Sequence, residues 1–423
     1  MKLLYTIHQF YPEFHSGTER FLLNLCSSLQ RDGHTVDVVT YSFQEQGSRT
    51  NGQLLVRDYF YKGIPVTAVR HVRVPIDIHS SWGSPEIADF AYNVLRKSKP
   101  DLVHVAHPMR LTAFVDVARE LSIPYVMTLT DFWTICPKIN LQTSSGAPCT
   151  GPEDGAVCAQ FCAELDRTFV KERLHRANMA LHGARAVVGP SKFVRSVLRK
   201  EVQSLQPKVI PHGIDRKYVF PGKGRHGSED NIVFAYCGGL SPHKGVHLLL
   251  RAFRRLDQGN CALRIYGGHF EQPDYYASLL ELAGDDKRIL FCGLYSEEQG
   301  PEILREIDVL VVPSLVYETY SLITHEALAS GVPVIASRAG ALDEAIENSV
   351  TGFTFTMGNE DELLAQFERV LADSEALNRI RIQLRSYVPW LIEEEAYQYQ
   401  RLYRSVLSRG KVDTSLPASE QLA

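Results

Sequence analysis

The amino-acid sequence predicts an α/β protein with two doubly wound domains, in which helices cover parallel sheets. Its 423 residues exceed what one hydrophobic core holds, because single cores stop growing at about 250 to 300 residues. Short apolar runs of strand length alternate with stretches in which apolar residues recur at helical spacing, and this alternation is typical of parallel sheets. The alternation is interrupted once, between Pro207 and Asp230, and then resumes.

The first series of strands and helices begins at the N-terminus. Residues 3–7 form an apolar run of strand length, and apolar side chains follow at helical spacing, at Phe21, Leu22, Leu25 and Leu29. Gly33 is typical of a helix end, and residues 36–39 form the next strand, which completes a βαβ unit. We expect the other strands of this first domain, which spans residues 1–207, at residues 101–105, 125–129 and 186–188.

The polar stretch 207–230 predicts the linker between the domains, and Pro211-His-Gly-Ile-Asp215 within it predicts a hinge. A second domain is predicted over residues 208–388, with a helix at 246–256 and strands at 232–236, 262–266, 289–292, 309–312 and 334–336. Doubly wound sheets bind ligands outside the carboxyl ends of their strands. We therefore expect the two domains to face each other across a cleft that holds the site.

The C-terminal part of the sequence is predicted to be helical. The helical pattern runs from Asp361 to about Tyr387, where Pro389 and Trp390 interrupt it. Residues 389–409 are predicted to form a helix that crosses back to the N-terminal domain. We expect the polar residues 410–423 to be a flexible tail.

The composition narrows the class of partner. The chain is 44% hydrophobic and 22% charged, which is typical of a globular protein and not of a disordered or fibrous one. A net charge of −4 gives no overall attraction for nucleic acid, so we expect no nucleic-acid partner. No stretch approaches the roughly 18 consecutive apolar residues of a membrane span, and Met1 is not followed by a signal peptide. We therefore expect a cytoplasmic protein.

The segment from Pro313 to Ser337 carries the most chemical information. A strand ends at Pro313, a polar loop carries Glu318, and a helix from about Ser321 carries Glu326. Free backbone N–H groups at a helix start bind a diphosphate, and carboxylates beside them accept hydrogen bonds from sugar hydroxyl groups. The combination predicts a nucleotide-sugar site. The alternative is that Glu318 only favours the helix start and that Glu326 is solvated.

At this segment the sequence resembles the retaining glycosyltransferases of family 4, which have the two-domain GT-B fold. Their motif has two glutamates eight positions apart around an aromatic-Gly pair, and the match continues here through EALASGVPVIA, which ends at residue 336. Glu318, Tyr320 and Glu326 match the motif, and Ser321 replaces the glycine. The resemblance implies that Glu318 contacts the donor sugar and Glu326 the ribose hydroxyls. It further implies that backbone N–H groups from Tyr320 to Leu322 face the diphosphate.

A second loop, from Tyr236 to Gly245, fits a phosphate-binding turn that ends in Lys244. The alternative is that Lys244 is an ordinary surface lysine. In the family, an arginine and this lysine both hold the donor diphosphate, and Gly239 stands at the arginine's position here. The missing contact costs roughly 1.5 to 3 kcal/mol. Either another cation replaces it, or the leaving diphosphate is stabilised less.

Two loops of the first domain also resemble family motifs. The loop from His15 to Arg20 resembles a Gly-rich loop between donor phosphate and acceptor, in which Gly17 lets a backbone approach the donor; alternatively it only caps a helix. Thr130 stands where the family has a histidine that reaches the donor sugar, and the following Asp131 is a candidate catalytic residue or a structural one. His107, at another strand end, is a candidate acceptor-binding residue or a core histidine.

Four cysteines lie in a predicted insertion over residues 134–164, at Cys136, Cys149, Cys158 and Cys162. Four thiolates can bind Zn²⁺ tetrahedrally, although the spacing contains no CxxC pair. A structural zinc ion, an iron–sulfur cluster and free or redox-active thiols are the alternatives. Because the family resemblance implies no metal requirement for transfer, we expect any metal here to be structural.

Residues 167–200 contain nine basic residues and one acidic residue, Glu172. They predict either a peripheral contact with the inner face of an anionic membrane or an ordinary solvated surface.

The sequence thus predicts a retaining glycosyltransferase with Glu318, Lys244 and Asp131 as its catalytic residues. Its predicted partners are a nucleotide-diphosphate sugar and a glycan or lipid-linked acceptor, in polysaccharide or glycoconjugate biosynthesis. Two alternatives remain: a non-catalytic nucleotide-sugar-binding subunit, because of Gly239 and Thr130, and a sugar-nucleotide epimerase of similar fold.

Overall fold

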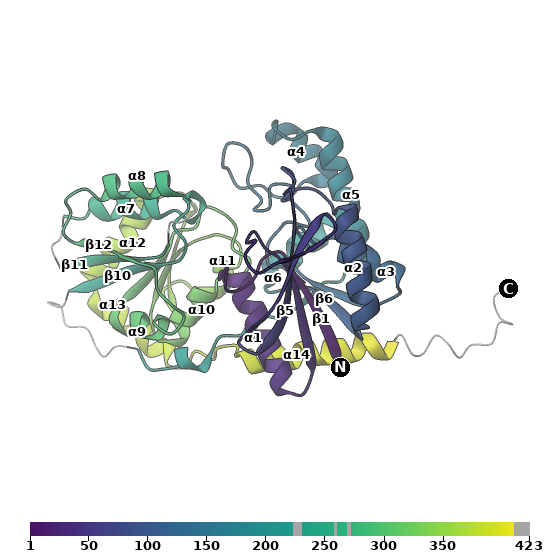
Figure 1. The fold of residues 1–423 in the computed structure, drawn as a ribbon. Helices are drawn as coiled ribbons and strands as arrows, with labels where there is room; N and C mark the ends of the chain where they lie inside the picture. The colour runs from purple at the N-terminus through teal and green to yellow at the C-terminus, as the bar shows by residue number, and fades with distance from the viewer. Residues whose placement is uncertain (223–230, 258–259, 269–271, 410–423) are drawn as a thin grey trace, which may run out of the picture. The chain divides into compact units, whose positions relative to one another are not determined.

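A computed structural model describes residues 1–222, 231–257, 260–268 and 272–409, which form two compact units (Figure 1). Unit 1 comprises Met1–Pro190, Val194–His212 and the chain from Ile392 on; unit 2 comprises Ser191–Phe193 and Gly213–Leu391. The boundary between His212 and Gly213 lies inside the stretch from which the linker was predicted. The predicted tail 410–423 and part of that stretch, 223–230, lie outside the described residues.

Unit 1 is built on a nine-stranded sheet of order β3-β4-β5-β2-β1-β6-β7-β8-β9. The strands from β5 to β9 in this order are parallel, and β3 and β4 extend the sheet as an antiparallel edge. The strands are β1 (Lys2–Ile7), β2 (Thr35–Tyr41), β3 (Arg49–Asn51), β4 (Leu54–Tyr61), β5 (Ile64–His71), β6 (Leu102–Val105), β7 (Tyr125–Thr128), β8 (Ala186–Gly189) and β9 (Lys208–Val209).

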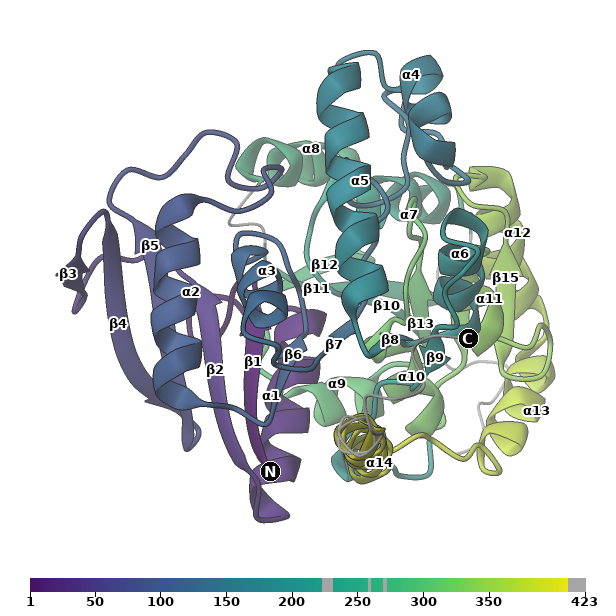
Figure 2. The ribbon, with the colours of Figure 1, turned by 90° about the vertical axis from the view of Figure 1, so that its right-hand side faces the viewer.

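The helices of unit 1 cover both faces of this sheet, with α2 and α3 on one face and α1 and α14 on the other (Figures 1 and 2). Tyr399 and Tyr403 of α14 are fully buried in one core with Tyr5 and Phe21. The helices are α1 (Gly17–Arg31), α2 (Pro85–Ser98), α3 (Ala113–Glu120), η1 (Glu153–Gly155), α4 (Ala156–Phe161), α5 (Arg167–Gly183), α6 (Lys192–Glu201) and α14 (Ile392–Arg409).

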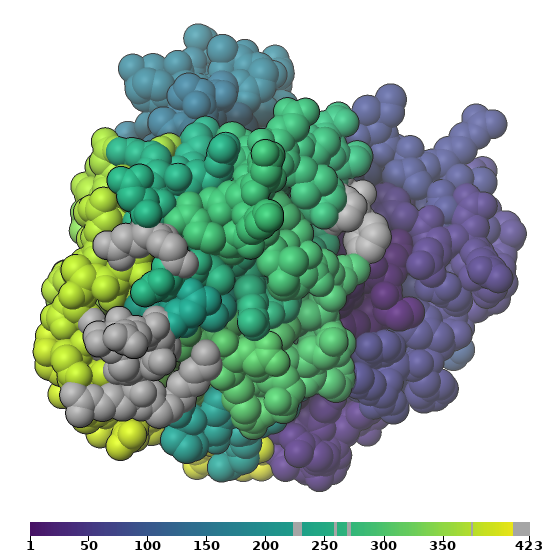
Figure 3. Space-filling model, turned by 90° about the vertical axis from the view of Figure 1, so that its left-hand side faces the viewer, coloured from purple at the N-terminus to yellow at the C-terminus, as the bar shows by residue number. Residues whose placement is uncertain are grey.

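Unit 2 is built on a six-stranded sheet of order β12-β11-β10-β13-β14-β15, in which every pair is parallel. Counted along the chain this is the order 3-2-1-4-5-6 of a dinucleotide-binding fold. Strand β12 forms one edge of this sheet. Figure 3 shows one face of the surface of unit 2, coloured from teal to yellow along the chain. The strands are β10 (Ile232–Cys237), β11 (Cys261–Tyr266), β12 (Ile289–Gly293), β13 (Val309–Val312), β14 (Val334–Ser337) and β15 (Gly352–Phe355).

The helices of unit 2 differ from prediction at one point. The pattern predicted from Asp361 to Tyr387 divides into two helices, because the Asp373 carboxylate accepts a hydrogen bond from the backbone N–H of Ala376 and starts a new helix there. The helices are η2 (Arg216–Tyr218), η3 (Pro242–Lys244), α7 (Val246–Arg254), α8 (Pro273–Ala283), α9 (Gly300–Glu306), α10 (Leu322–Ala329), α11 (Leu342–Ala345), α12 (Glu360–Ala372) and α13 (Ser374–Leu384).

The predicted α/β class with two doubly wound domains is confirmed, and the topology locates the ligand-binding edge of each unit. The strand order reverses between β1 and β6 in unit 1 and between β10 and β13 in unit 2. Ligands of such sheets bind at this reversal, outside the carboxyl ends of the two strands. The loops that follow these strands carry Gly17 and His107 in unit 1, and Lys244 and Glu318 in unit 2.

Candidate functional site

In unit 2, the structure brings together two of the predicted catalytic residues. The Lys244 Nζ atom lies 2.8 Å from Glu318 Oε1, and the Ser314 hydroxyl donates a hydrogen bond of 2.5 Å to the same oxygen. The side chains are 32% and 14% exposed, so the ion pair is shielded and still reachable by a ligand. Sequence reasoning assigned both residues to one donor but did not predict that they contact each other.

Gly245 explains how the Lys244 turn reaches this position. A Cβ atom on Gly245 would lie 2.0 Å from the carbonyl oxygen of Pro313, and its φ of 73° is in the left-handed region. Only glycine allows both the close approach and this backbone conformation. The next loop is held to the turn by a hydrogen bond of 2.8 Å from Leu315 N to the His243 carbonyl. The turn after β10 is thus packed against the loop after β13.

The backbone of Glu318 is fixed from the other side by the loop after β14. Glu318 N donates to the Ala339 carbonyl, and the Glu318 carbonyl accepts from Ala341 N at 2.9 Å. Between them, Gly340 has a φ of 67°, and a Cβ atom there would lie 2.8 Å from the Glu318 carbonyl oxygen. Backbone contacts on both sides therefore place the Glu318 carboxylate.

The charge of Glu318 follows from these contacts. Burial alone would raise the pKa of this carboxyl group. The Lys244 ammonium, the Ser314 hydrogen bond and the nearby His243 outweigh burial and hold the pKa below its ordinary value. Glu318 is therefore an anion at neutral pH and can accept hydrogen bonds from hydroxyl groups.

The start of α10 explains why a glycine fits the position of Ser321. Ser321 is the N-cap residue of α10 and has a left-handed backbone, with φ 70° and ψ 83°. This conformation is strained for a residue that has a Cβ atom. Its hydroxyl lies 2.7 Å from that of Thr324, and the following Leu322 is the first residue of the helix. The diphosphate contact predicted for the backbone N–H groups of this turn stays a prediction.

Tyr320 and Glu326 are buried around this turn. The Tyr320 ring stacks on His325 at 4.2 Å, and His325 Nδ1 lies 2.9 Å from the Tyr387 hydroxyl. Glu326 on α10 is fully buried. Tyr320 thus braces the turn through its ring, whereas the ribose contact predicted for Glu326 stays a prediction.

Gly239 leaves room where the family resemblance places an arginine. Within the part of the chain that the structure describes, no heavy atom beyond its chain neighbours lies within 4 Å of the position that a Cβ atom on Gly239 would occupy. Its φ is outside the left-handed region. A larger side chain therefore fits at this position.

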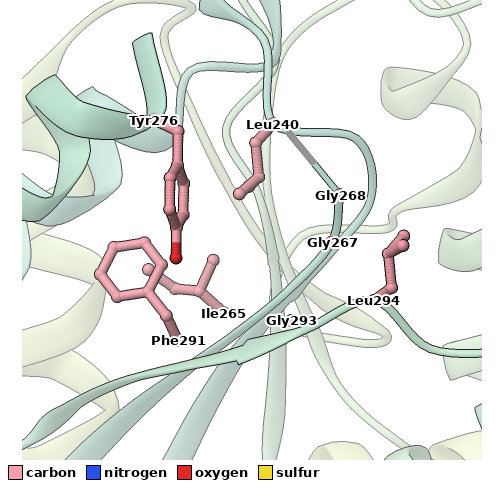
Figure 4. A pocket seen from close by; sticks show the side chains of 8 residues that line it. All are labelled: Leu240, Ile265, Gly267, Gly268, Tyr276, Phe291, Gly293 and Leu294. Carbon is pink, nitrogen blue, oxygen red and sulfur yellow. The ribbon is translucent and has the colours of Figure 1, made fainter. Parts of the chain in front are cut away.

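A cavity of about 140 Å³ lies beside Gly239, at the carboxyl ends of β10, β11 and β12 (Figure 4). The rings of Tyr276 and Phe291 form part of its wall and meet edge to face at 5.7 Å. Sequence reasoning did not find this cavity, since its residues are far apart along the chain. They are Leu240, Ile265, Gly267, Gly268, Tyr276, Phe291, Gly293 and Leu294.

In unit 1, the predicted Gly-rich loop opens α1. Gly17 is exposed and is the first residue of the helix. Ser16 closes a capping box, because its backbone N–H donates to Glu19 Oε2 at 2.6 Å and its hydroxyl donates at 2.5 Å. Burial raises the pKa of Glu19. Helix capping, the alternative weighed for this loop, is therefore present, and the donor contact of Gly17 stays a prediction.

His107 and Asp131 form a pair at the ends of β6 and β7. His107 Nε2 lies 2.7 Å from Asp131 Oδ2. The backbone N–H of Met109 donates to His107 Nδ1 at 3.2 Å, so the proton sits on Nε2 and is donated to Asp131. The His107 side chain is 2% exposed, against 35% for Asp131. His107 therefore orients Asp131, which is the member of the pair open to a ligand.

Thr130, the residue predicted to reach the donor sugar, precedes this aspartate and is half-buried. Asp131 Oδ1 also accepts from Trp133 N at 2.9 Å, which fixes the second carboxylate oxygen. The donor contact predicted for Thr130 stays a prediction.

The four clustered cysteines are buried and free of disulfides. Burial, with a contribution from the other three thiols, raises the pKa of Cys158 to about 12. Over residues 1–222, 231–257, 260–268 and 272–409, no three His, Cys, Asp or Glu side chains are grouped so that they could hold a metal ion. Zinc stays a prediction that elemental analysis tests: one ion per chain would support it, and none would contradict it.

The basic segment divides between core and surface. Arg173 is buried and lies over the Trp133 ring at 3.4 Å, whereas Arg167, Lys171 and His175 are exposed along α5. Among the described residues, no helix has both the length and the apolar character needed to cross a membrane.

Two family models match this chain. The model described as glycosyltransferase family 4 matches residues 15–218, and the model described as glycosyl transferases group 1 matches residues 223–386. The two matches fall largely on unit 1 and unit 2, respectively.

Curated relatives point the same way. The chain is 30% identical over 384 residues to the uncharacterized glycosyltransferase MJ1607 of Methanocaldococcus jannaschii, covering 88% of this chain and 90% of that protein. It is 26% identical to the lipopolysaccharide 1,2-N-acetylglucosaminetransferase of Salmonella typhimurium, covering 53% of this chain and 66% of the relative.

Solved structures share the fold over nearly the whole chain. Sucrose-phosphate synthase from Thermosynechococcus elongatus has a TM-score of 0.72 at 19% identity, covering 96% of this chain and 99% of that chain. Anabaena HepE in complex with UDP and glucose has a TM-score of 0.69 at 19% identity, covering 96% and 100%. Fold and matches define the protein as a glycosyltransferase of the GT-B class. The chain belongs to glycosyltransferase family 4.

Proposed function

We propose that this glycosyltransferase moves a sugar from a nucleotide-diphosphate sugar to a hydroxyl group of a glycan or lipid-linked acceptor, with retention of the anomeric configuration, in polysaccharide or glycoconjugate biosynthesis. The shielded Lys244–Glu318 pair carries the proposal, since it sets a cation for a diphosphate beside an anion for sugar hydroxyls. It lies at the reversal of strand order in unit 2.

The reaction needs little acid or base chemistry from the protein. The acceptor oxygen forms a bond to the anomeric carbon on the face from which the diphosphate departs, as the bond between this carbon and the diphosphate oxygen breaks. An oxygen atom of the departing diphosphate takes the proton of the acceptor hydroxyl group. Lys244 and the backbone N–H groups at the start of α10 stabilise the charge that develops on the diphosphate. Glu318 holds the sugar hydroxyls in position, which makes positioning a large part of catalysis.

The cavity beside Gly239 is proposed to receive the nucleoside base. Its aromatic and aliphatic wall suits a flat ring, and the lining residue Leu240 belongs to the turn that carries Lys244, which supports this proposal. The HepE structure bound to UDP-glucose is consistent with a donor of this kind.

The acceptor is proposed to meet unit 1 through Asp131 and, if it is lipid-linked, to be reached at an anionic membrane. Arg167 and Lys171 on α5, with exposed Phe161 and Met179 nearby in the chain, support this contact. Sedimentation with phosphatidylglycerol vesicles tests it. Binding should fall with salt and with Lys171→Glu, and equal binding to neutral phosphatidylcholine vesicles would contradict it.

The reaction is tested with a panel of UDP-, GDP- and ADP-sugars and candidate acceptors. Proton NMR coupling constants of the product give its anomeric configuration relative to the donor. A product of retained configuration that the wild type forms and Glu318→Gln does not form supports the proposal. A product of inverted configuration contradicts it. Donor binding without transfer or hydrolysis across the panel would favour a non-catalytic subunit. Release of a converted sugar without an acceptor would favour an epimerase.

A further inference from the structure

His243 is a titratable residue at the donor site to which the sequence motifs assign no role. It lies in η3 directly before Lys244, and its carbonyl accepts the hydrogen bond from Leu315 N that joins the turn to the loop carrying Glu318. Its ring Nε2 lies 3.3 Å from the Ser241 hydroxyl. Because Gly245 packs closely against the Pro313 carbonyl, the backbone of this turn is held in one position.

The cation of this turn, Lys244, is already paired with an anion, so a diphosphate here gains from a further positive charge. Lys244 and Glu318 lie 2.8 Å apart, so the positive charge of one is offset by the negative charge of the other. The diphosphate of a nucleotide sugar carries two negative charges at neutral pH. Gly239, which begins the same turn, contributes no side chain. A further positive charge at this turn would improve donor binding.

We propose that His243 is a donor-binding residue that takes up a proton when the diphosphate enters and then holds it as an imidazolium. The inference rests on the proposed function, since it concerns the same donor. The proton comes from solvent and adds to a ring nitrogen, and no covalent bond to the donor is formed or broken.

The electrostatics of the free protein agree with this role. Burial and the Lys244 ammonium, opposed by Glu318, lower the pKa of His243 to about 4. The ring is therefore neutral at pH 6 to 8 in the free protein. Two negative charges placed beside it stabilise the protonated form and raise its pKa. Binding of the donor and binding of the proton are then coupled, and each strengthens the other.

Calorimetry measures the coupling directly. UDP-glucose, GDP-mannose and ADP-glucose are titrated into the full chain at pH 6, in buffers with different heats of ionisation. Each phosphate of these donors is bound through one ester and one anhydride oxygen and keeps only a strongly acidic OH group, so neither titrates near this pH and any proton taken up enters the protein. We expect proton uptake in the wild type and none in His243→Gln. His247→Gln, which changes another partly buried histidine one turn further on, is the matched control and should keep the uptake.

The pH dependence of affinity gives a second readout. Donor binding by the wild type should be at least about fivefold tighter at pH 5.5 than at pH 8, which corresponds to a partial rise in one pKa. In His243→Gln the two affinities should agree within about twofold. His243→Ala serves as a second variant. Both His243→Gln and His243→Ala keep the backbone carbonyl that accepts the hydrogen bond from Leu315 N. Thermal melting verifies that each variant is folded.

The outcomes separate the two proposals. If none of the donors binds, the proposed function fails. If a donor binds and His243→Gln takes up as many protons as the wild type, or if the wild type takes up none, the role of His243 is wrong and the proposed function stands.

Discussion

The hydroxyl group of Tyr403 on α14 lies 2.6 Å from Nδ1 of His104 on β6, and both side chains are fully buried. The other ring nitrogen of His104 lies 2.8 Å from the Thr128 hydroxyl, which in turn lies 2.9 Å from the Tyr399 hydroxyl. A satisfied polar network of this kind fixes one packing of a helix on a sheet, because any shift leaves buried polar groups without partners. It thus ties α14 to the first unit in one register.

This network predicts a loss of stability in acid. Burial lowers the pKa of His104 to about 3, below the value near 6.5 of an unfolded chain. The stabilisation from the neutral His104 is complete above about pH 6.5 and is lost as the pH falls toward 3. The loss in the free energy of unfolding amounts to about 2 kcal/mol by pH 5. Thermal unfolding of wild type and His104→Gln from pH 7.5 to 5 measures it. The variant should be less stable at pH 7.5 and lose less on acidification; parallel curves would contradict the assignment.

Substitutions of Lys244 and of Glu318 should have different effects on donor binding and on sugar transfer. Lys244→Met removes a charge-assisted contact and should weaken nucleotide-sugar binding by about 1.5 to 3 kcal/mol. Glu318→Gln keeps the shape and leaves Lys244 free to meet the diphosphate, so binding should persist while transfer falls at least about a hundredfold. Calorimetry and initial rates separate the effects. Equal losses of binding in both variants would argue against separate roles.

Ser321→Gly should stabilise the protein. Ser321 holds a left-handed backbone that costs an L-residue roughly 1 to 2 kcal/mol, and glycine removes that cost. The lost hydrogen bond to Thr324 offsets part of the gain. Chemical denaturation compares the variant with Ser321→Ala, which loses the hydroxyl but keeps the strain and should therefore be destabilised. A loss of stability in both variants would show that the hydroxyl matters more than the strain.

Gly239→Arg should strengthen donor binding. The position has room for a side chain and an ordinary φ, so the variant is expected to fold. An arginine that reaches the diphosphate contributes about 1.5 to 3 kcal/mol, or roughly tenfold to a hundredfold in affinity. Gly239→Ala is the control and should bind as the wild type does. Unchanged affinity in the arginine variant would place the diphosphate away from this turn.

The sequence predicted the central strands well and missed several strands at or near the sheet edges. Residues 309–312 were predicted and observed as a strand without error, because a fully buried strand is a continuous apolar run. The hairpin β4–β5 was missed: β4 has one half-exposed face, and its alternating apolar and polar residues give a weaker signal. The strand β15, at an edge of the sheet of unit 2, was also missed, because its four residues are too short a run, and not a continuously apolar one, to stand out as a strand.

The individual residues of the site could be predicted from the sequence, but the contacts between them could not. Motifs identified Lys244 and Glu318, yet 74 positions separate them, and only the parallel pairing of β10 with β13 places their loops together. The pairing of His107 with Asp131 likewise follows from the adjacency of β6 and β7. His243 was overlooked because its neighbourhood comes from the loop after β13 and not from its own sequence.

The membership of α14 in unit 1 means that the main segment of unit 2, Gly213–Leu391, is an insertion between two segments of unit 1. The two crossings run next to each other, since Ile214 N donates to the Trp390 carbonyl at 2.9 Å. Trimming the polypeptide at 391 would therefore damage the half of the protein that was synthesised first. Excising residues 213–391 and joining the two neighbouring ends with a short spacer would instead leave unit 1 with its sheet and with α14.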